Sequence, residues 1–315
     1  MKQFLPVLAA VLVLGACGSP PAGKAPAVKT GRFVALARNS GFSAWSADGE
    51  TWTAAALPAS APWWNAAFGG GRFVALAFPG GKAAWSADGK TWSALALPGG
   101  NWSGLAFGGG RFAAVAQDSA RAAWSADGET WTAAALPESE LWQVLAFGGG
   151  RFVALAFHSG RAAWSGGGET WTAAALPARD LWQALAFGGG RFVAAVYNGD
   201  RAAWSADGET WTEARLPNRD YWQALACGGG RFVAVAQNSD RAAWSANGET
   251  WIAAALPAKD RWQALAFGGG RFVAVSGSTG VSGGQAAWSA DGGKTWTAAA
   301  LPGGGDWSSV AWGEW

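Results

Sequence analysis

Residues 141–177 read LWQVLAFGGGRFVALAFHSGRAAWSGGGETWTAAALP, and close copies of this stretch fill most of the 315-residue chain. The dipeptide Arg-Phe marks each copy, at spacings of 40 residues with a single step of 39: Arg32, Arg72, Arg111, Arg151, Arg191, Arg231 and Arg271. The chain therefore contains seven repeats, and its fold follows from the repeat unit.

Each repeat contains four apolar runs of five to seven residues, separated by clusters of Gly, Pro, Asn, Asp or Ser. In the quoted unit these runs are Trp142–Phe147, Arg151–Phe157, Arg161–Ser165 and Thr170–Leu176. Runs this short, bounded by turn residues, predict strands. Alanine is a poor strand former, but four short strands in a unit of about 40 residues are typical of a propeller blade. We therefore expect an all-β chain.

The two ends of the repeat region predict a closed ring. The region opens on a second strand at Arg32 and ends on a first strand, WSSVAW, at Trp307 to Trp312. If these two pieces pair, no sheet edge is left exposed. The sequence thus predicts a seven-bladed β-propeller of four-stranded antiparallel blades over residues 31–315, closed by pairing of the C-terminal strand with the N-terminal blade.

The N-terminus, MKQFLPVLAAVLVLGAC, has the basic residue, apolar run and small residues of a secretory signal, and it is too short for a membrane span. Leu14-Gly15-Ala16-Cys17 resembles the bacterial lipobox, which implies that residues 1–16 are a lipoprotein signal peptide and that Cys17 is lipidated. An ordinary signal peptide with an incidental cysteine is the alternative. Residues 17–30 are rich in Pro, Gly and Ala and predict a flexible tether.

Lipidation of Cys17 would place the protein in the bacterial cell envelope, anchored to a membrane by its acyl chains. Gly18 rather than Asp follows the cysteine, which favours the outer membrane, with the protein facing the periplasm or the cell surface.

A second phrase recurs between the third and fourth strands. It reads SADGGKTW at residues 289–296 and is one residue shorter in the other six copies, three of which read SADGETW. Its aspartate can accept hydrogen bonds from backbone N–H groups ahead of it, and its glycine can take a positive φ. We predict a structural role for these aspartates: Asp48, Asp88, Asp127, Asp207 and Asp291. Calcium binding is the alternative, but each turn offers one carboxylate where calcium needs several oxygens.

SADGGKTW fits the pattern Ser-x-Asp-x-Gly-x-Thr-Trp of the Asp-box, the bacterial neuraminidase repeat found in sialidases and many other propellers. The chain resembles compact Asp-box propellers over nearly its whole mature length. The resemblance implies that ligands bind on the face remote from the Asp-boxes. It also implies that a sialidase-like glycoside hydrolase would need an arginine triad, a Tyr with a Glu, and an acid/base Asp.

That constellation is missing from the sequence. The arginines recur with the repeat period, and the only tyrosines, Tyr197 and Tyr221, have no obvious Glu partner. His158 is the sole histidine, and Cys227 takes the place of a Phe found in other copies. We therefore predict no catalytic residues and no enzyme, with the glycoside hydrolase as the least favoured alternative.

The composition excludes other classes of function. The 23 basic and 21 acidic side chains nearly balance, which argues against a nucleic-acid partner. One His and two Cys leave few metal ligands, so we expect no metal and no cofactor. We expect a monomer.

The candidate binding residues lie where the copies differ, in the loops between second and third strands and between fourth and first strands. Either recognition or simple drift explains that variation. The tryptophans that begin the first strands could stack on sugar rings or apolar side chains, or pack between blades: Trp63, Trp102, Trp142, Trp182, Trp222, Trp262 and Trp307. Three consecutive loops carry Arg179, Arg219 and Lys259, which could meet an anionic partner or pair with the Asp that follows each.

These observations predict a non-catalytic, membrane-anchored binding or scaffold propeller. Its partner would dock on the face with the variable loops. We expect that partner to be an envelope protein, with a lectin-like propeller that binds a glycan as the alternative.

Overall fold

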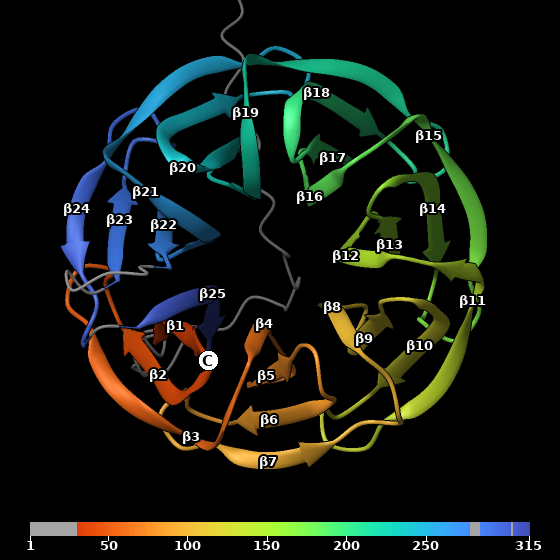
Figure 1. Cartoon of the computed structure of the whole chain (residues 1–315), viewed down its shortest axis with the longest axis horizontal. Coiled ribbons are helices and arrows are strands. Elements are labelled where there is room, and N and C mark those ends of the chain that lie inside the picture. Colours follow the sequence, from red (N-terminus) through yellow and green to blue (C-terminus); the bar gives the residue numbers. More distant parts are fainter. Residues whose placement is uncertain (1–29, 278–283, 304) are drawn as a thin grey trace, which may run out of the picture.

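The computed structural model of the protein describes residues 30–277, 284–303 and 305–315. Within these ranges every regular element is a strand, which confirms the all-β prediction. Figure 1 shows the strands grouped into sheets that stand around a common centre. The signal peptide predicted for residues 1–16, Cys17 and the tether up to residue 29 lie outside the described residues.

Four sheets contain four antiparallel strands each. The first consists of β25 (Asp306–Glu314), β1 (Gly31–Arg38), β2 (Ser40–Ser46) and β3 (Thr53–Ala61). The second consists of β4 (Trp63–Gly69), β5 (Arg72–Ala77), β6 (Lys82–Ser86) and β7 (Ser93–Ala96). The third consists of β8 (Trp102–Gly108), β9 (Arg111–Ala116), β10 (Ser119–Ser125) and β11 (Thr132–Glu140). The fourth consists of β12 (Trp142–Gly148), β13 (Arg151–Ala156), β14 (Ser159–Ser165) and β15 (Thr172–Asp180).

The remaining strands form one nine-stranded sheet. In order they are β16 (Trp182–Gly188), β17 (Arg191–Val196), β18 (Asn198–Ser205), β19 (Thr212–Gly228), β20 (Arg231–Ser245), β21 (Ile252–Gly268), β22 (Arg271–Ser276), β23 (Gln285–Ser289) and β24 (Thr297–Ala300). Strands β19 and β21 each have 17 residues, because the fourth strand of one repeat continues into the first strand of the next. The early part of β19 pairs with β18 and its later part with β20. The repeat persists here, although it is not divided into separate sheets.

The last strand pairs with the first. Strand β25 runs antiparallel to β1, from Gly31 opposite Glu314 to Arg38 opposite Asp306. The hydroxyl of Ser308 also donates to the carbonyl of Trp63 at 2.6 Å, which links β25 to β4 of the neighbouring sheet.

Strand register separates two rims of the molecule. Phe152 pairs with Ser165 near one end of the repeat, whereas Trp142 pairs with Ala156 and Ser159 with Asp180 near the other end. The GGG turns and the turns that contain Asp48 and its equivalents therefore share one rim, which we call the turn rim. The loops that differ among copies share the other, which we call the loop rim.

Most fourth strands extend further than the sequence predicts, whereas β7 and β24 have only four residues each. Strand β15 extends past Pro177 to Asp180, because Asp180 pairs with Ser159 after a bulge in which residues 176–179 lie opposite Gly160 alone. Residues that we expected in a loop are thus held in the sheet. The adjoining turn is tight, with His158 in the left-handed region at φ 61°.

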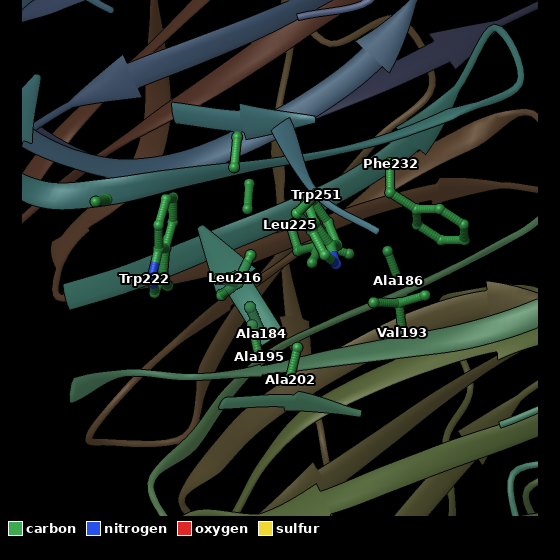
Figure 2. Packing of buried hydrophobic residues seen from close by; sticks show 13 residues of the cluster. Ala184, Ala186, Val193, Ala195, Ala202, Leu216, Trp222, Leu225, Phe232 and Trp251 are labelled. Atoms are coloured by element: carbon green, nitrogen blue, oxygen red, sulfur yellow. The ribbon is translucent and has the colours of Figure 1, made fainter. Parts of the chain in front are cut away.

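Small residues allow the sheets to pack closely. In β13 and β14 the alanines Ala154 and Ala163 are fully buried. Figure 2 shows one interface, where Trp222 and Leu225 belong to the same hydrophobic cluster as Ala184, Val193 and Leu216 of the preceding repeat. Dense packing of this kind leaves no room for larger side chains in the central strands, which explains how an alanine-rich sequence forms strands.

Candidate functional site

Hydrogen bonds within each turn hold the turn rim together. Asp48 Oδ1 accepts the N–H groups of Glu50 and Thr51, both at 2.9 Å, while Gly49 takes a φ of 78°. The aspartates at the equivalent positions accept in the same way: Asp88, Asp127, Asp207 and Asp291. Asn247 does so through its amide oxygen, and Gly167 has no side chain to do so. These side chains are occupied in shaping the turn.

The same bonds keep the carboxylates ionised. The backbone N–H groups of Thr130 and Glu129 lower the pKa of Asp127 to about 2. Partial burial opposes this effect at Asp48, Asp88 and Asp207, yet the hydrogen bonds still lower the pKa of each. A carboxylate that accepts several N–H groups favours its charged form, so these groups are poorly suited to proton transfer near neutral pH.

The periodic arginines also belong to the turn rim. Arg151 lies over the ring of Trp164, with Cζ 4.3 Å from the centroid, and pairs with Glu209 in the turn of the next repeat. Equivalent pairs join Arg72 with Glu129, Arg111 with Glu169, Arg191 with Glu249 and Arg271 with Glu50. The repeat spacing revealed these arginines, but nothing in the sequence indicated which glutamate each one meets.

Of the two roles considered for the first-strand tryptophans, ligand stacking and packing between blades, their burial favours packing. Their exposed fractions are at most 2%, for Trp63, Trp102, Trp142, Trp182, Trp222, Trp262 and Trp307. The indole N–H of Trp142 donates to the carbonyl of Glu138 at 3.0 Å. A ring that is enclosed by neighbouring sheets cannot stack on a sugar, so packing between repeats is the role that this placement supports.

The three basic loop residues remain accessible and do not pair with the aspartates that follow them. Arg179, Arg219 and Lys259 are exposed. Asp180 instead accepts from the N–H of Leu181 at 2.9 Å and pairs with a guanidinium of the next repeat. Arg179 and Arg219 line two different cavities, so the structure does not bring the basic residues together in one site.

A central cavity of about 250 Å³ is lined by the first strands of the repeats. The residue after each buried tryptophan lies at the loop-rim end of the first strand. We call those that line the cavity the channel mouth: Trp64, Gln143, Gln183, Gln223, Gln263 and Ser308. Two residues further along these strands, a layer of aliphatic side chains also lines the cavity: Leu105, Leu145, Leu185, Leu225, Leu265 and Val310. These residues were not predicted as binding residues, because the prediction rested on the invariant tryptophan that precedes each of them.

The glutamines of the mouth are only partly satisfied. Gln143 donates through Nε2 to Oε1 of Gln183 at 2.9 Å. Gln263 accepts from Gln237 at 2.9 Å and from Nε of Arg261 at 2.8 Å when its amide is turned to suit these donors. The amide of Gln223 makes no hydrogen bond to any described residue.

Charged and aromatic side chains surround one side of the mouth. The hydroxyl of Tyr197 donates to Gln237 at 2.6 Å, and its ring lies 5.2 Å from that of Tyr221. The guanidinium of Arg38 lies 4.3 Å from the centroid of Trp64. Burial lowers the pKa of Arg38, and nearby Asp306 opposes that effect. Gln237 is thus the hydrogen-bond partner of Tyr197.

Three further features of the described residues concern a nucleophile, a metal site and a membrane span. Burial raises the pKa of the Cys227 thiol to about 11, which leaves the sulfur protonated and unreactive at neutral pH. No group of three or more His, Cys, Asp or Glu side chains among the described residues is arranged to hold a metal ion. Within the same ranges there is no helix of the length and apolarity that a membrane span requires.

The sequence matches no family model and no curated protein. Solved structures do match: an inactive variant of virginiamycin B lyase from Staphylococcus aureus with quinupristin has a TM-score of 0.70 at 11% identity, covering 77% of this chain and 87% of that one. YCF48 bound to a D1 peptide has a TM-score of 0.60 at 17% identity, covering 77% of this chain and 82% of that one. AztD from Citrobacter koseri has a TM-score of 0.57 at 12% identity, covering 91% of this chain and 99% of that one. All three are β-propellers with four-stranded blades, so the chain has a β-propeller fold.

Proposed function

We propose that the protein is a non-catalytic binding propeller whose partner docks on the loop rim, over the channel mouth. The observation that carries this proposal is the unused hydrogen-bonding capacity of the mouth, beside a central cavity. Concave sites with a few convergent polar groups are where proteins commonly bind ligands. On the turn rim, by contrast, the aspartates and most of the periodic arginines already have partners within the protein.

The proposal includes seven four-stranded blades closed into a ring by β25. Seven Arg-Phe repeats and the pairing of β25 with β1 support the count and the closure. Arg271 pairs with Glu50, which lies near the other end of the chain. Arg151 and Glu209 form the same kind of ion pair between consecutive repeats. The hydrogen bonds of the turns are compatible with the Asp-box resemblance.

The proposal also includes a lipid anchor at Cys17, with the tether of residues 17–30 holding the propeller clear of an envelope membrane. An outer-membrane location, facing the periplasm or the cell surface, follows from Gly18. The partner in this setting is an envelope protein or a glycan, and the protein acts as a monomer. Exposed Arg179, Arg219 and Lys259 would favour acidic groups at the edge of the partner.

Site-specific crosslinking in intact cells tests the docking face. A photoreactive amino acid replaces Tyr221, which is 44% exposed on the loop rim, or Glu169, which is exposed on the turn rim, as the control. We expect a discrete crosslinked partner from position 221 and none from position 169. Equal crosslinking from both rims, or none from the loop rim, would contradict the proposal.

Two simpler measurements test the lipid anchor and the non-catalytic role. Replacing Cys17 with Ser should release the protein from the membrane fraction. Hydrolysis of a fluorogenic sialoside that is abolished by a loop-rim substitution would show that the protein is an enzyme after all.

A further inference from the structure

The cavity at the channel mouth has an uncharged lining. Its polar side chains are amides and hydroxyls, Trp64 adds an indole, and the rest are aliphatic. Arg38 and Arg261 contact the lining residues Trp64 and Gln263 but do not line the cavity themselves, and Arg261 pairs with Asp306 at 3.6 Å. Because an unpaired charge is costly to remove from water, this cavity suits a neutral group with hydrogen-bonding capacity.

Several hydrogen-bond donors and acceptors of the amides around this cavity have no protein partner. The bond from Gln143 to Gln183 leaves Oε1 of Gln143 and Nε2 of Gln183 without a protein partner, although Gln183 is only 8% exposed. Gln223 has both ends of its amide free, and Asn65, which donates to the carbonyl of Ser103 at 3.4 Å, retains its acceptor. These donors and acceptors come from β4, β12, β16 and β19 and therefore approach the cavity from several directions.

Trp64 supplies an apolar surface beside the amides. It is half-buried, whereas its neighbour Trp63 is 1% exposed. Arg38 lies over its ring and Phe78 packs at 6.1 Å, so the indole is held in place. A fixed indole beside polar groups offers an apolar face for C–H groups together with hydrogen bonds at the edge of a ligand.

We propose that the channel mouth binds one uncharged sugar ring of a glycan; this rests on the proposed function, because it names the ligand of the same face. A hydroxyl both donates and accepts, as an amide does, and the hydroxyls of a pyranose point outward in several directions. A peptide group presents its donor and acceptor on opposite sides and matches this encircling arrangement less well. The cavity, at about 250 Å³, lies just below the usual range of roughly 300–1,000 Å³ for ligand sites, so it holds one ring with the rest of the chain outside.

Titration calorimetry and saturation-transfer NMR on the mature protein test the proposal. The probes are neutral trisaccharides (maltotriose, cellotriose, chitotriose and mannotriose), the acidic 3′-sialyllactose, and an uncharged capped tripeptide. We expect saturable binding of at least one neutral trisaccharide and none of the other two probes.

Variants assign that binding to the mouth. Gln223→Leu should weaken it about three- to tenfold, the effect of losing a hydrogen-bonded pair. The Gln223→Leu variant should keep the fold, because the amide of Gln223 has no hydrogen-bond partner in the protein to lose. Gln285→Leu, on β23, is the matched control and should bind as the unaltered protein does. Trp64→Ala should abolish transfer to the sugar protons and leave a folded protein by circular dichroism.

The outcomes separate the two proposals. Binding of no neutral trisaccharide, or binding that Gln223→Leu and Trp64→Ala leave unchanged, would overturn the sugar site. Competition by the tripeptide or by sialyllactose at the mouth would also overturn it. If loop-rim crosslinking still yields a partner in those cases, the docking proposal stands, whereas loss of both results would remove it as well.

Discussion

The turn rim and the channel mouth are built by the same seven repeats, yet they differ in how their polar groups are used. On the turn rim Asp127 and its equivalents accept backbone N–H groups, and the periodic arginines reach the next repeat. At the mouth the residue after the buried tryptophan is Trp64, Ser308 or a glutamine, depending on the repeat. A position that a turn uses for its own hydrogen bonds varies little among copies: it is aspartate in five of the seven, with Asn247 and Gly167 as the exceptions. A position without that duty is free to differ, and there recognition can develop.

Two adjacent residues show the difference most directly. Trp63 is enclosed between repeats, whereas Trp64 stands at the mouth with part of its ring on the cavity. Chemical type alone does not separate them. The neighbouring sheets decide which one is packing and which one is available.

The largest effect should come from the buried tryptophans. We expect Trp182→Ala to lower the free energy of unfolding by about 3–5 kcal/mol, because its side chain is 0% exposed and its removal leaves a cavity. Trp64→Ala, at the mouth, should cost clearly less. Urea unfolding followed by far-ultraviolet circular dichroism measures both, and comparable losses would erase the distinction between packing and mouth.

A stabilising substitution sharpens the account of the turn rim. Gly167→Asp should raise the free energy of unfolding by about 1–2 kcal/mol, from new hydrogen bonds and from loss of glycine's freedom in the unfolded chain. A Cβ at this site meets only the flexible end of Arg111, at 3.3 Å. Gly166→Asp is the matched control, since a side chain there finds open space. Thermal unfolding compares the two, and equal gains would indicate that charge alone is responsible.

Sequence periodicity was sufficient for the regular parts of the molecule. It predicts the strand content, the shared rim of the aspartate turns and the positive φ of Gly49, because each of these depends on a few neighbouring residues. It did not predict that β19 runs through 17 residues, since continuation past Pro217 depends on pairing with β18 and β20.

The candidate site was harder to predict because it depends on contacts between repeats. The burial of Trp142 reflects two sheets that close over it, and one repeat taken alone does not contain that information. The pairing of Gln143 with Gln183 joins residues 40 positions apart. Alignment of the repeats could have revealed the mouth, since four of the seven repeats carry a glutamine directly after the tryptophan.

Acid should weaken the turn rim in a defined pH window. The pKa of Asp127 is about 2 in the folded protein and about 3.9 in an unfolded chain. The unfolded state therefore binds more protons between these values, so the carboxylate's contribution is complete above about pH 4 and is lost as the pH falls towards 2. Asp127→Asn keeps the acceptor, as Asn247 shows, but removes the titration. Because this group is exposed, we expect an effect smaller than that of Gly167→Asp.

Unfolding temperatures measured from pH 5 to pH 2 test this expectation. The Asp127→Asn variant should lose less stability than the unaltered protein over that window. Carboxyl NMR shifts would report the pKa of Asp127 independently, and a value near 3.9 in the folded protein would contradict the assignment.

The smallest effect tests whether the ring is closed. Arg271 pairs with Glu50 across the two ends of the chain, and Arg191 pairs with Glu249 between consecutive repeats, with nearly identical exposure in both pairs. Double-mutant cycles with Ala should give each pair a coupling of a few tenths of a kcal/mol, within the range of about 0.2–1 kcal/mol for exposed pairs. In an open spiral Arg271 would have no partner, and its coupling would vanish while that of Arg191 remained. High salt should abolish both couplings, so the difference between the two cycles at low salt measures closure itself.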